Sequence, residues 1–600
     1  MYIELLAPAA SVELLDAVIG EGADAVYIGL ESLKPNLKGS SFSFSQFEAS
    51  LRSLRRMKKK LYVTVDSIFE QREADRIFQL LNYLNSAGPD AVIIQDLGVL
   101  AMLRSEFSAL KIHASSRMNI ASARACNALS RHGVSRAALA RELSAEELRD
   151  IRAHSNMELE LAVHGEACVS VSGLCLFSSF LGGKSANRGM CTSACGRLYH
   201  TSDTDSGYYF CAADLQLSED LPEIAAAGIN AVKIEGRMRN AAYAAMVVSA
   251  YRLVLDAIID GNENNIRYSI TEAQRILHSD PGRISKKSNK PVIAANARPG
   301  KKPPGFEKAP IPQITFKNSD RHKEKNAVFP DGLYVAVSSI NDLYIVQSSR
   351  PVKVMLSLNR TNARYLLSEG KKPLPFKPDD IILVLDPFFP QSDNGQLEEL
   401  IPELADWGYR QFVVNNLGHL SLFRALRAEL KLIAGPWLYT FNAWALSFIA
   451  SLGVDGLVSP LENNRQNLER TVSVLNSRSA RSMIFVPVFA WPPLFRIRNE
   501  PKSLHDVKTF SDNLNETFFI NKNEEGLNVY PEKPFSITDK IPFLREAGYK
   551  RFVIDLSGRS LKKNDYKDLM QAVNNNTPLP RISRFNWKNG FYCDTPQYPS

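Results

Sequence analysis

Short β-branched runs alternate with amphipathic helical stretches along the first part of the chain. Each run is four to six residues long, and most are followed by a segment of helical length before the next run begins. Eight βα units in about 240 residues is the size of a TIM barrel, so the pattern predicts an α/β, TIM-barrel-like (β/α)8 domain. The predicted strands are IELLA (3–7), AVYIGL (25–30), LYVTVD (61–66), AVIIQD (91–96), KIHA (111–114), AALARE (137–142), LELAVH (159–164) and AVKIE (231–235).

The pattern repeats later in the chain at a constant offset of 320 residues. Residues 90–111 (DAVIIQDLGVLAMLRSEFSALK) align with residues 410–431 (RQFVVNNLGHLSLFRALRAELK), and Glu142 aligns with Glu462. A fixed offset over separated landmarks indicates an internal duplication. We therefore expect a barrel domain at 1–280, a linker at 281–330 and a second, degenerate copy of similar βα architecture at 331–600.

Polar residues occupy the predicted strand ends of the first copy. In a (β/α)8 barrel the carboxyl ends of the strands converge on one mouth, where chemistry is usually carried out. We therefore expect these side chains to surround a common site. They are Asp66, Asp96, His113, Glu142, His164 and Glu235.

The second copy keeps carboxylates at three strand ends, Asp386, Glu462 and Asp555, but has Ile433 in place of His113. It also has no cysteine-rich loop, which makes it a poor candidate for the same chemistry. Its aromatic and basic residues could stack on a ligand or bind phosphate, or could simply belong to the core. These residues are Trp437, Trp444, Trp491, Arg496 and Arg498.

Four of the seven cysteines lie in one glycine- and serine-rich segment that follows the seventh predicted strand. Cys168, Cys175, Cys191 and Cys195 have the spacing C-x6-C-x15-C-x3-C. Structural zinc sites usually begin with tighter knuckles, whereas a four-iron cluster spreads its ligands more widely. The segment predicts a metal site at the barrel mouth, with an iron–sulfur cluster, zinc and no metal as the alternatives. Cys211, which lies 16 residues further on, could replace one ligand.

Basic side chains flank the cysteines. Lys184, Arg188 and Arg197 could stabilise thiolates or hold an anionic substrate. The β-period places Lys233 and Glu235 on one side of their strand, facing into the barrel, and Arg237 begins the next loop. A charged pair inside a barrel needs partners or a ligand, so a structural ion-pair network and a catalytic role are both open.

Charge and composition limit the classes of protein. The net charge of +8 comes from residues 283–325, where twelve Lys or Arg face three acids, in a stretch that also carries GKKPPG and APIP. Such a linker could hold phosphates or be a solvated connector. An odd number of cysteines argues against a disulfide framework. No secretory signal and no uninterrupted apolar run of about 18 residues are present, so we expect a cytoplasmic protein that does not span a membrane.

These blocks together resemble peptidase family U32, the collagenase-like group. The resemblance rests on His164-Gly165 before Cys168, Ser172-Gly173 before Cys175, and Asn187-Arg188-Gly189 before Cys191. It continues through IHASSRMNI (112–120), ARELSAEEL (140–148) and KIEGRMR (233–239). The resemblance covers about residues 1–260. It implies a barrel-type fold and, in several relatives, a [4Fe–4S] cluster on cysteines like these.

The resemblance implies a function in hydroxylation of tRNA or ribosomal RNA bases, or of a quinone precursor, and is greatest to the branch linked to 23S ribosomal RNA cytidine hydroxylation. On this hypothesis Cys168, Cys175, Cys191 and Cys195 ligate the cluster. The predicted catalytic residues are Glu142, His113, Glu235 and His164, and the predicted substrate-binding residues are Lys184, Arg188, Lys233, Arg237 and Asn119.

The partners expected from the resemblance are RNA and a small carboxylate co-substrate. Two alternatives remain. One is a collagenase-like peptidase, in which His164 would act with Cys168, although no H-E-x-x-H or G-x-S-x-G motif is present. The other is a non-catalytic or electron-transfer scaffold, which a barrel mouth covered by the second domain would favour.

Overall fold

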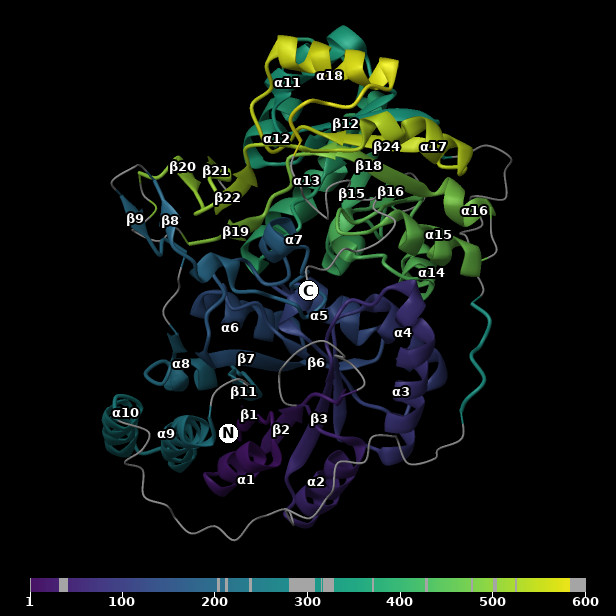
Figure 1. The fold of residues 1–600 in the computed structure, drawn as a ribbon. Coiled ribbons are helices and arrows are strands. Elements are labelled where there is room, and N and C mark those ends of the chain that lie inside the picture. Colours follow the sequence, from purple (N-terminus) through teal and green to yellow (C-terminus); the bar gives the residue numbers. More distant parts are fainter. Residues whose placement is uncertain are drawn as a thin grey trace.

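The first half of the chain forms a closed eight-stranded parallel barrel (Figure 1). The computed structural model describes residues 2–31, 41–201, 205–210, 214–236, 240–279, 308–314, 316, 328–369, 372–426, 430–475, 478–499, 504, 506–523 and 526–582. Strand β1 pairs with both β2 and β11, and β7 pairs with β6 and β11, which closes the sheet on itself. The strands are β1 (Glu4–Pro8), β2 (Ala25–Ile28), β3 (Lys60–Val65), β4 (Ala91–Ile94), β5 (Ile112–Ala114), β6 (Val134–Ala138), β7 (Glu158–Gly165) and β11 (Ala231–Ile234).

Each of the eight strands overlaps one of the eight predicted runs, so the predicted α/β barrel is confirmed. The largest boundary difference is at the sixth strand, which ends at Ala138 instead of Glu142. Helices pack outside the strands, and several begin at a serine whose hydroxyl accepts from the first-turn amides, as Ser43 and Ser144 do in complete capping boxes. They are α1 (Val12–Gly20), α2 (Phe44–Arg56), α3 (Ala74–Ala87), α4 (Leu97–Glu106), α5 (Ala123–Ser130), α6 (Ala145–His154), α8 (Leu221–Ala226), α9 (Ala241–Asp260) and α10 (Glu263–Leu277).

The second half forms another closed eight-stranded parallel barrel. Its strands are β12 (Gly332–Val337), β13 (Lys353–Ser357), β14 (Ile381–Val384), β15 (Gln411–Val414), β16 (Lys431–Ala434), β17 (Gly456–Val458), β18 (Ile484–Ala490) and β24 (Arg551–Asp555). Its helices are α11 (Ile340–Val346), α12 (Arg360–Leu367), α13 (Asn394–Asp406), α14 (Ala443–Ser451), α15 (Arg465–Val474), α16 (Arg478–Ser482), α17 (Ile541–Glu546) and α18 (Lys563–Asn575).

The duplication extends to small details of the backbone. Strand β10 (Leu215–Gln216) pairs antiparallel with β7, and β23 (Phe535–Ser536) pairs antiparallel with β18, again 320 residues apart. Asn119 and Tyr439, also separated by 320, both adopt left-handed backbone, with φ of 55° and 44°. Two copies of the architecture are therefore present.

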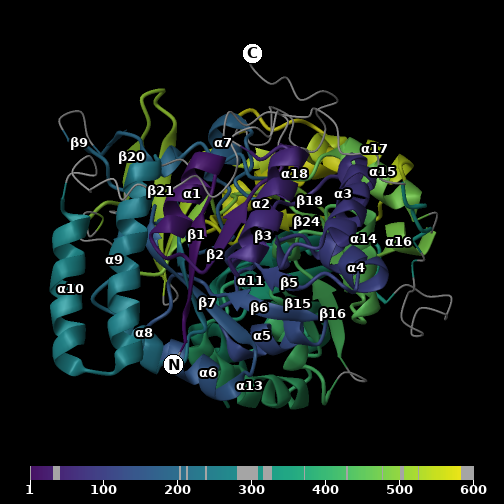
Figure 2. The ribbon, with the colours of Figure 1, turned by 90° about the horizontal axis from the view of Figure 1, so that it is seen from below.

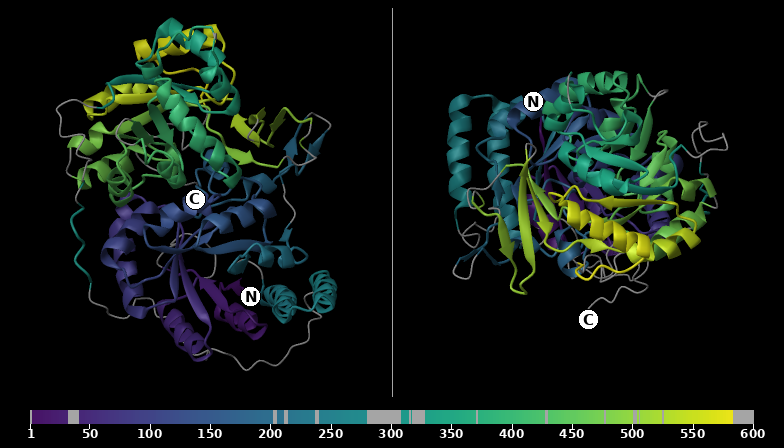
Figure 3. Two further views of the ribbon diagram at one scale, coloured as in Figure 1. Left: turned by 180° about the vertical axis from the view of Figure 1, so that it is seen from behind. Right: turned by 90° about the horizontal axis from the view of Figure 1, so that it is seen from above.

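The two barrels face each other through the carboxyl ends of their strands, with the second barrel above the first in Figure 1 and in the left view of Figure 3. The contacts obey an approximate two-fold relation. The Ala443 amide donates to Gln71 Oε1 at 2.7 Å, and the Ala123 amide donates to Gln391 Oε1 at 2.8 Å. Helix α4 packs on α14, and α5 packs on the 3-10 helix η10 (Leu417–Ser421), which occupies the position of α4 in the second copy. The second barrel therefore covers part of the first barrel's mouth.

A small third sheet joins the cysteine-bearing segment to the second half. Its strands run in the order β19 (Phe495–Ile497), β22 (Gly526–Pro531), β21 (Thr517–Asn523), β20 (Thr509–Ser511), β8 (Tyr199–His200) and β9 (Ser206–Gly207). Aromatic rings from both halves pack against it, with centroids 4.9 Å apart for Phe177 and Phe495 and 5.2 Å apart for Tyr199 and Phe510. The sheet fixes the cysteine-bearing segment against the second barrel.

Helix α9 is long and apolar enough to cross a membrane by length and composition alone. In the structure it packs against α1, β1 and α10 and contributes buried side chains to the main hydrophobic core, and α9 and α10 lie side by side in Figure 2. This packing is typical of the core helix of a globular domain. Most of the predicted basic linker lies outside the described residues. In its described part, Ala309 exchanges two hydrogen bonds with Gln79 of α3, at 2.8 and 3.2 Å.

Candidate functional site

The cysteine loop follows β7 and lies between the two barrels. Its backbone is held by the second half, because the Val171 amide donates to the carbonyl of Arg496 at 2.7 Å and the Leu176 amide donates to the carbonyl of Leu494 at 2.6 Å. The loop contains a short helix, α7 (Phe177–Gly182), in which the Ser179 hydroxyl donates to the buried Glu462 carboxylate of the second barrel. The loop, which the sequence predicts over the mouth of the first barrel, thus also contacts the second barrel.

The four thiols of the loop lie near one another. Cys168 and Cys191 are exposed, and Cys175 and Cys195 are half-buried. Although Cys168 is exposed as a residue, the protein atoms around its thiol keep water away and raise its pKa; burial likewise raises the pKa of Cys175 and raises that of Cys195 to about 12. The charges of the other thiolates also raise these pKa values, and all six pairs among the four cysteines interact in this way. Among the described residues, no three His, Cys, Asp or Glu side chains converge on one point as ligands of a single metal ion would.

An arginine–glutamate pair lies beside Cys168. Arg141 Nη2 donates to Glu235 Oε2 at 2.6 Å, and the Arg141 charge lowers the pKa of Glu235 and offsets part of the rise that burial causes in the pKa of Cys168. Glu142 lies on the same loop after β6 and accepts from the backbone amide and hydroxyl of Ser172, at 3.1 and 3.2 Å. Burial raises the pKa of Glu142. Glu235 and Glu142 therefore lie at the cysteine loop, where the sequence predicts them.

His113 lies elsewhere, at the amino-terminal end of the first barrel. Its ring packs edge-on against Tyr62, with centroids 4.8 Å apart, next to a network in which Arg136 Nη1 and Lys60 Nζ each donate to Glu4 at 2.6 Å. Glu4 and Lys60 are the first residues of their strands, so the network forms the floor of the barrel and not its mouth. Burial and the Arg136 charge lower the pKa of His113 to about 3.

His164 also departs from its expected position. Strand β7 has an irregularity opposite Lys233 and Ile234, where Ala162 pairs with the first and His164 with the second. The extra residue turns His164 to the outer face of the barrel. There its Nδ1 lies 3.3 Å from the Tyr251 hydroxyl and its Nε2 lies 3.0 Å from the Tyr243 hydroxyl, both on α9. The ring is thus directed away from Cys168.

The predicted substrate-binding residues do not gather into one site. Lys184 is exposed on the cysteine loop. Arg188 is half-buried against the first barrel, where its Nη1 donates to Glu73 at 3.0 Å. Lys233 lies inside the barrel, 3.6 Å from Glu160 Oε1, with its ammonium 4.8 Å from the centre of the Tyr27 ring. Asn119 lies between the barrels and donates to the carbonyl of Pro387 at 2.6 Å. Arg237 and Cys211 lie outside the described residues.

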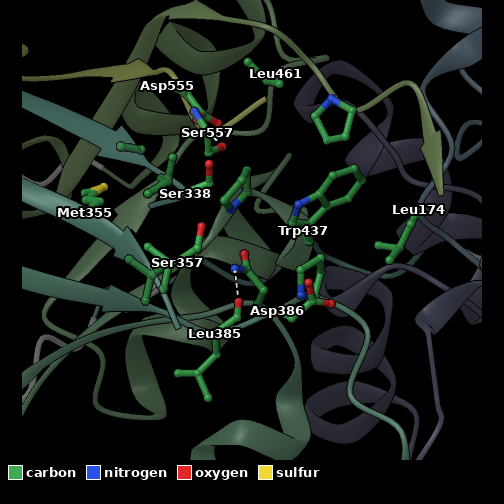
Figure 4. A pocket seen from close by; sticks show the side chains of 18 of the residues that line it. Leu174, Ser338, Met355, Ser357, Leu385, Asp386, Trp437, Leu461, Asp555 and Ser557 are labelled. Atoms are coloured by element: carbon green, nitrogen blue, oxygen red, sulfur yellow. Dashed lines mark hydrogen bonds between the residues drawn. The ribbon is translucent and has the colours of Figure 1, made fainter. Parts of the chain in front are cut away.

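A cavity lies in the mouth of the second barrel, next to the cysteine loop. It has a volume of about 340 Å³, and Leu174 and Leu176, the neighbours of Cys175, form part of its wall (Figure 4). Its other polar and aromatic lining includes Asp386, Arg496, Trp437 and Asp555. The sequence pattern singled out these four but gave no reason to combine them. The signal that could have done so for Asp386, Trp437 and Asp555 is their common position at or just after strand ends of one barrel, whereas Arg496 lies in β19 of the third sheet.

The fold and the site define a duplicated (β/α)8 protein with a four-cysteine loop between two facing barrels. The sequence model of peptidase family U32 matches residues 10–287, which span the first barrel from α1 onwards. An uncharacterized protease of Methanocaldococcus jannaschii is 31% identical over 294 residues, covering 46% of this chain and 71% of that protein. This chain belongs to peptidase family U32.

Two further relatives are named for RNA hydroxylation. The tRNA hydroxylation protein P1 of Bacillus subtilis is 30% identical over 273 residues, covering 44% of this chain and 65% of that protein. The 23S rRNA 5-hydroxycytidine C2501 synthase of Escherichia coli is 32% identical over 265 residues, covering 43% of this chain and 40% of that protein. Both matches span less than half of this chain and less than two thirds of the relative.

Proposed function

We propose that this protein hydroxylates bases of ribosomal or transfer RNA and uses an iron–sulfur cluster held by Cys168, Cys175, Cys191 and Cys195. The observation that carries the proposal is the grouping of four thiols, all close enough to affect one another's charge, on a loop between two barrel mouths. The similarity to proteins named for tRNA and 23S rRNA hydroxylation supports RNA as the substrate class.

The donor set suits a [4Fe–4S] cluster better than a single zinc ion. Zinc needs all its ligands about 2.3 Å from one point, whereas the thiolates of a cubane cluster bind four separate irons. The thiols are neighbours, yet no three metal-binding side chains of the described chain converge on one point. When bound, such a cluster would supply one-electron redox chemistry.

The surrounding residues have roles that follow from their contacts. The Arg141 charge favours the thiolate form of Cys168, which is the form that ligates metal. Glu235 holds Arg141 in place through their 2.6 Å hydrogen bond. Glu142 orients the loop by accepting from Ser172 and, because burial raises its pKa, can hold a proton near the cysteines.

Anaerobic purification tests the cofactor directly. We expect a brown protein with broad visible absorption and iron and sulfide in equal amounts. The absorption should be lost in the variant with all four cysteines replaced by alanine. The matched control is Cys126→Ala, because Cys126 is fully buried in α5 and is not one of the four thiols of the cysteine loop. A colourless protein that contains one zinc would refute the cluster.

One observation favours a second candidate, an electron-transfer scaffold that only supplies electrons to another enzyme. The second barrel packs over the first barrel's mouth, where Asn119 binds the carbonyl of Pro387 and Asn442 binds Asp96. Purified protein with reductant and a hydroxyl donor separates the two candidates. Hydroxylation of isolated RNA supports the enzyme, and hydroxylation that appears only with a second protein supports the scaffold.

A further inference from the structure

We infer that the mouth of the second barrel binds an unpaired nucleobase and presents it to the cysteine loop. This inference rests on the proposed function for the source of the base, an RNA. It assigns the substrate pocket to the copy of the barrel that lacks the cysteines. The complete site then combines this pocket with the cysteine loop of the first copy. The cavity's size, lining and place beside Cys175 carry the argument.

The cavity has the dimensions and walls of a small-ligand site. Its volume of about 340 Å³ lies within the range of about 300–1,000 Å³ that is typical of ligand pockets. Its apolar floor is the interior of the second barrel, formed by Met355, Val384, Val413, Val458 and Val553. In Figure 4 the indole of Trp437 lies between Leu174 and the side chains of Ser338 and Ser357.

The aromatic and acidic lining matches the chemistry of a base. Trp437 offers a flat, half-buried ring at the cavity wall, and aromatic side chains stack on every kind of nucleobase. Asp386 and Asp555 supply carboxyl oxygens that accept from exocyclic amino groups and ring N–H groups. Burial raises the pKa of Asp555, which favours its protonated form.

The charges exclude a phosphate from this cavity. Among its lining residues in the described part of the chain, Arg496 is the cationic side chain, and it forms an ion pair with Asp386. An adjoining cavity of about 290 Å³ shares Asp386 and Arg496 with the first and is lined by the exposed Arg360 and by Arg498. Arg498 is paired with Glu147, and Asp393 also lines this cavity, so the phosphate of a base in the barrel mouth would lie beside the exposed Arg360, as expected of a nucleotide within an RNA strand.

The cavity adjoins the cysteine loop, where the proposed cluster would bind. Leu174 and Leu176 precede and follow Cys175, and both line the cavity. The loop is held there by the bond from the Leu176 amide to the carbonyl of Leu494. A base seated on the barrel floor is therefore adjacent to the cysteine loop without entering the first barrel, whose mouth is partly covered.

Two variants test the inference by opposite changes. Trp437→Ala removes the stacking surface, and Ser338→Trp fills the cavity. The probes are a fluorescein-labelled RNA hairpin with an unpaired cytidine, followed by anisotropy, and free cytidine, followed by calorimetry. We expect each variant to weaken binding roughly 5- to 150-fold, the range that corresponds to loss of one stacked base. Trp407→Ala is the matched control, because Trp407 lies at the end of α13, exposed and away from the cavity.

The outcomes distinguish this inference from the proposed function. Weakened binding of either probe in both variants, with an unchanged circular dichroism spectrum, supports a base site. If only binding of the hairpin is weakened, the ligand is RNA. If binding of cytidine is weakened, the site also accepts a free nucleoside. Binding that neither variant changes overturns the inference. If a strain lacking the protein keeps its RNA hydroxylation while binding still depends on Trp437, the proposed function fails and the base site stands. If the gene encoding Trp437→Ala fully restores RNA hydroxylation to that strain, the proposed function stands and the base site is overturned.

Discussion

Replacing Glu462 by alanine should detach the cysteine loop from the second barrel. The Glu462 carboxylate is buried, with 8% of the residue exposed, and it accepts from the Ser179 hydroxyl of α7 and from the Tyr439 hydroxyl at 2.9 Å. Tyr439 in turn accepts from Asn187 Nδ2 at 2.7 Å, so the carboxylate anchors two points of the loop. Each hydrogen bond to a charged group contributes about 1.5–3 kcal/mol, and removing the buried charge offsets part of the loss, so we expect a net cost of about 3 kcal/mol.

The assay is hydrogen exchange of the α7 amides, read by mass spectrometry. A fall of about 3 kcal/mol in the free energy of local opening corresponds to amide exchange roughly 150-fold faster, because the exchange rate is proportional to the equilibrium constant of opening. The matched control is Glu398→Ala, which removes another ion pair between the barrels, with Arg124, but from a side chain that is 64% exposed. That pair should contribute less than about 1 kcal/mol. Unchanged α7 exchange in Glu462→Ala, or equal effects of the two substitutions, would refute the reasoning.

Three further predictions concern the barrel floor, the interface and the thiols. The pKa of Glu4 is lowered to about 2, chiefly by Arg136 acting against burial, so its stabilisation is present above the ordinary value of 4.5 and lost as the pH falls towards 2. Glu4→Gln should cost about 3 kcal/mol in urea unfolding at neutral pH, and a cost that stays constant down to pH 2 would contradict this. Gly98→Ala places a methyl group 2.2 Å from Asn442 Oδ1 of the other barrel and should lower the free energy of unfolding by about 1–3 kcal/mol. Its control is Gly395→Ala, whose added methyl group meets nothing within 4 Å and should not lower that free energy. Equal melting temperatures for the two variants would argue against the interface between the barrels. Gelatin zymography should show no hydrolysis that depends on Cys168, and activity abolished by Cys168→Ala would establish a thiol peptidase instead.

Local patterns were sufficient to predict the strands and the duplication. Most barrel strands are buried on both faces and read as short apolar runs, and the constant offset aligned the second set with the first. The relation between the barrels was not predictable in this way. The bonds that set it, such as those of Gln71 with Ala443 and Gln391 with Ala123, join positions more than 260 residues apart, and nothing in either local segment indicates its partner.

The site was predictable where one strand or loop defined it and not where several elements combine. The cysteines were identified from their spacing, but strict alternation along β7 fails at the irregularity that turns His164 outward. Arg141 was missed because the sixth run reads as a strand up to Glu142, although β6 ends at Ala138 and leaves Arg141 in a loop. The cavity of the second barrel depends on small side chains, such as Ser338 and Ser357, that leave space only in the folded barrel.

Mass spectrometry of ribosomal and transfer RNA from a strain that lacks this protein tests the central claim most directly. We predict that one hydroxylated base loses its added oxygen atom, that the wild-type gene restores it, and that genes encoding Cys175→Ala or Trp437→Ala do not. An RNA modification profile identical to that of the parent strain would contradict the account.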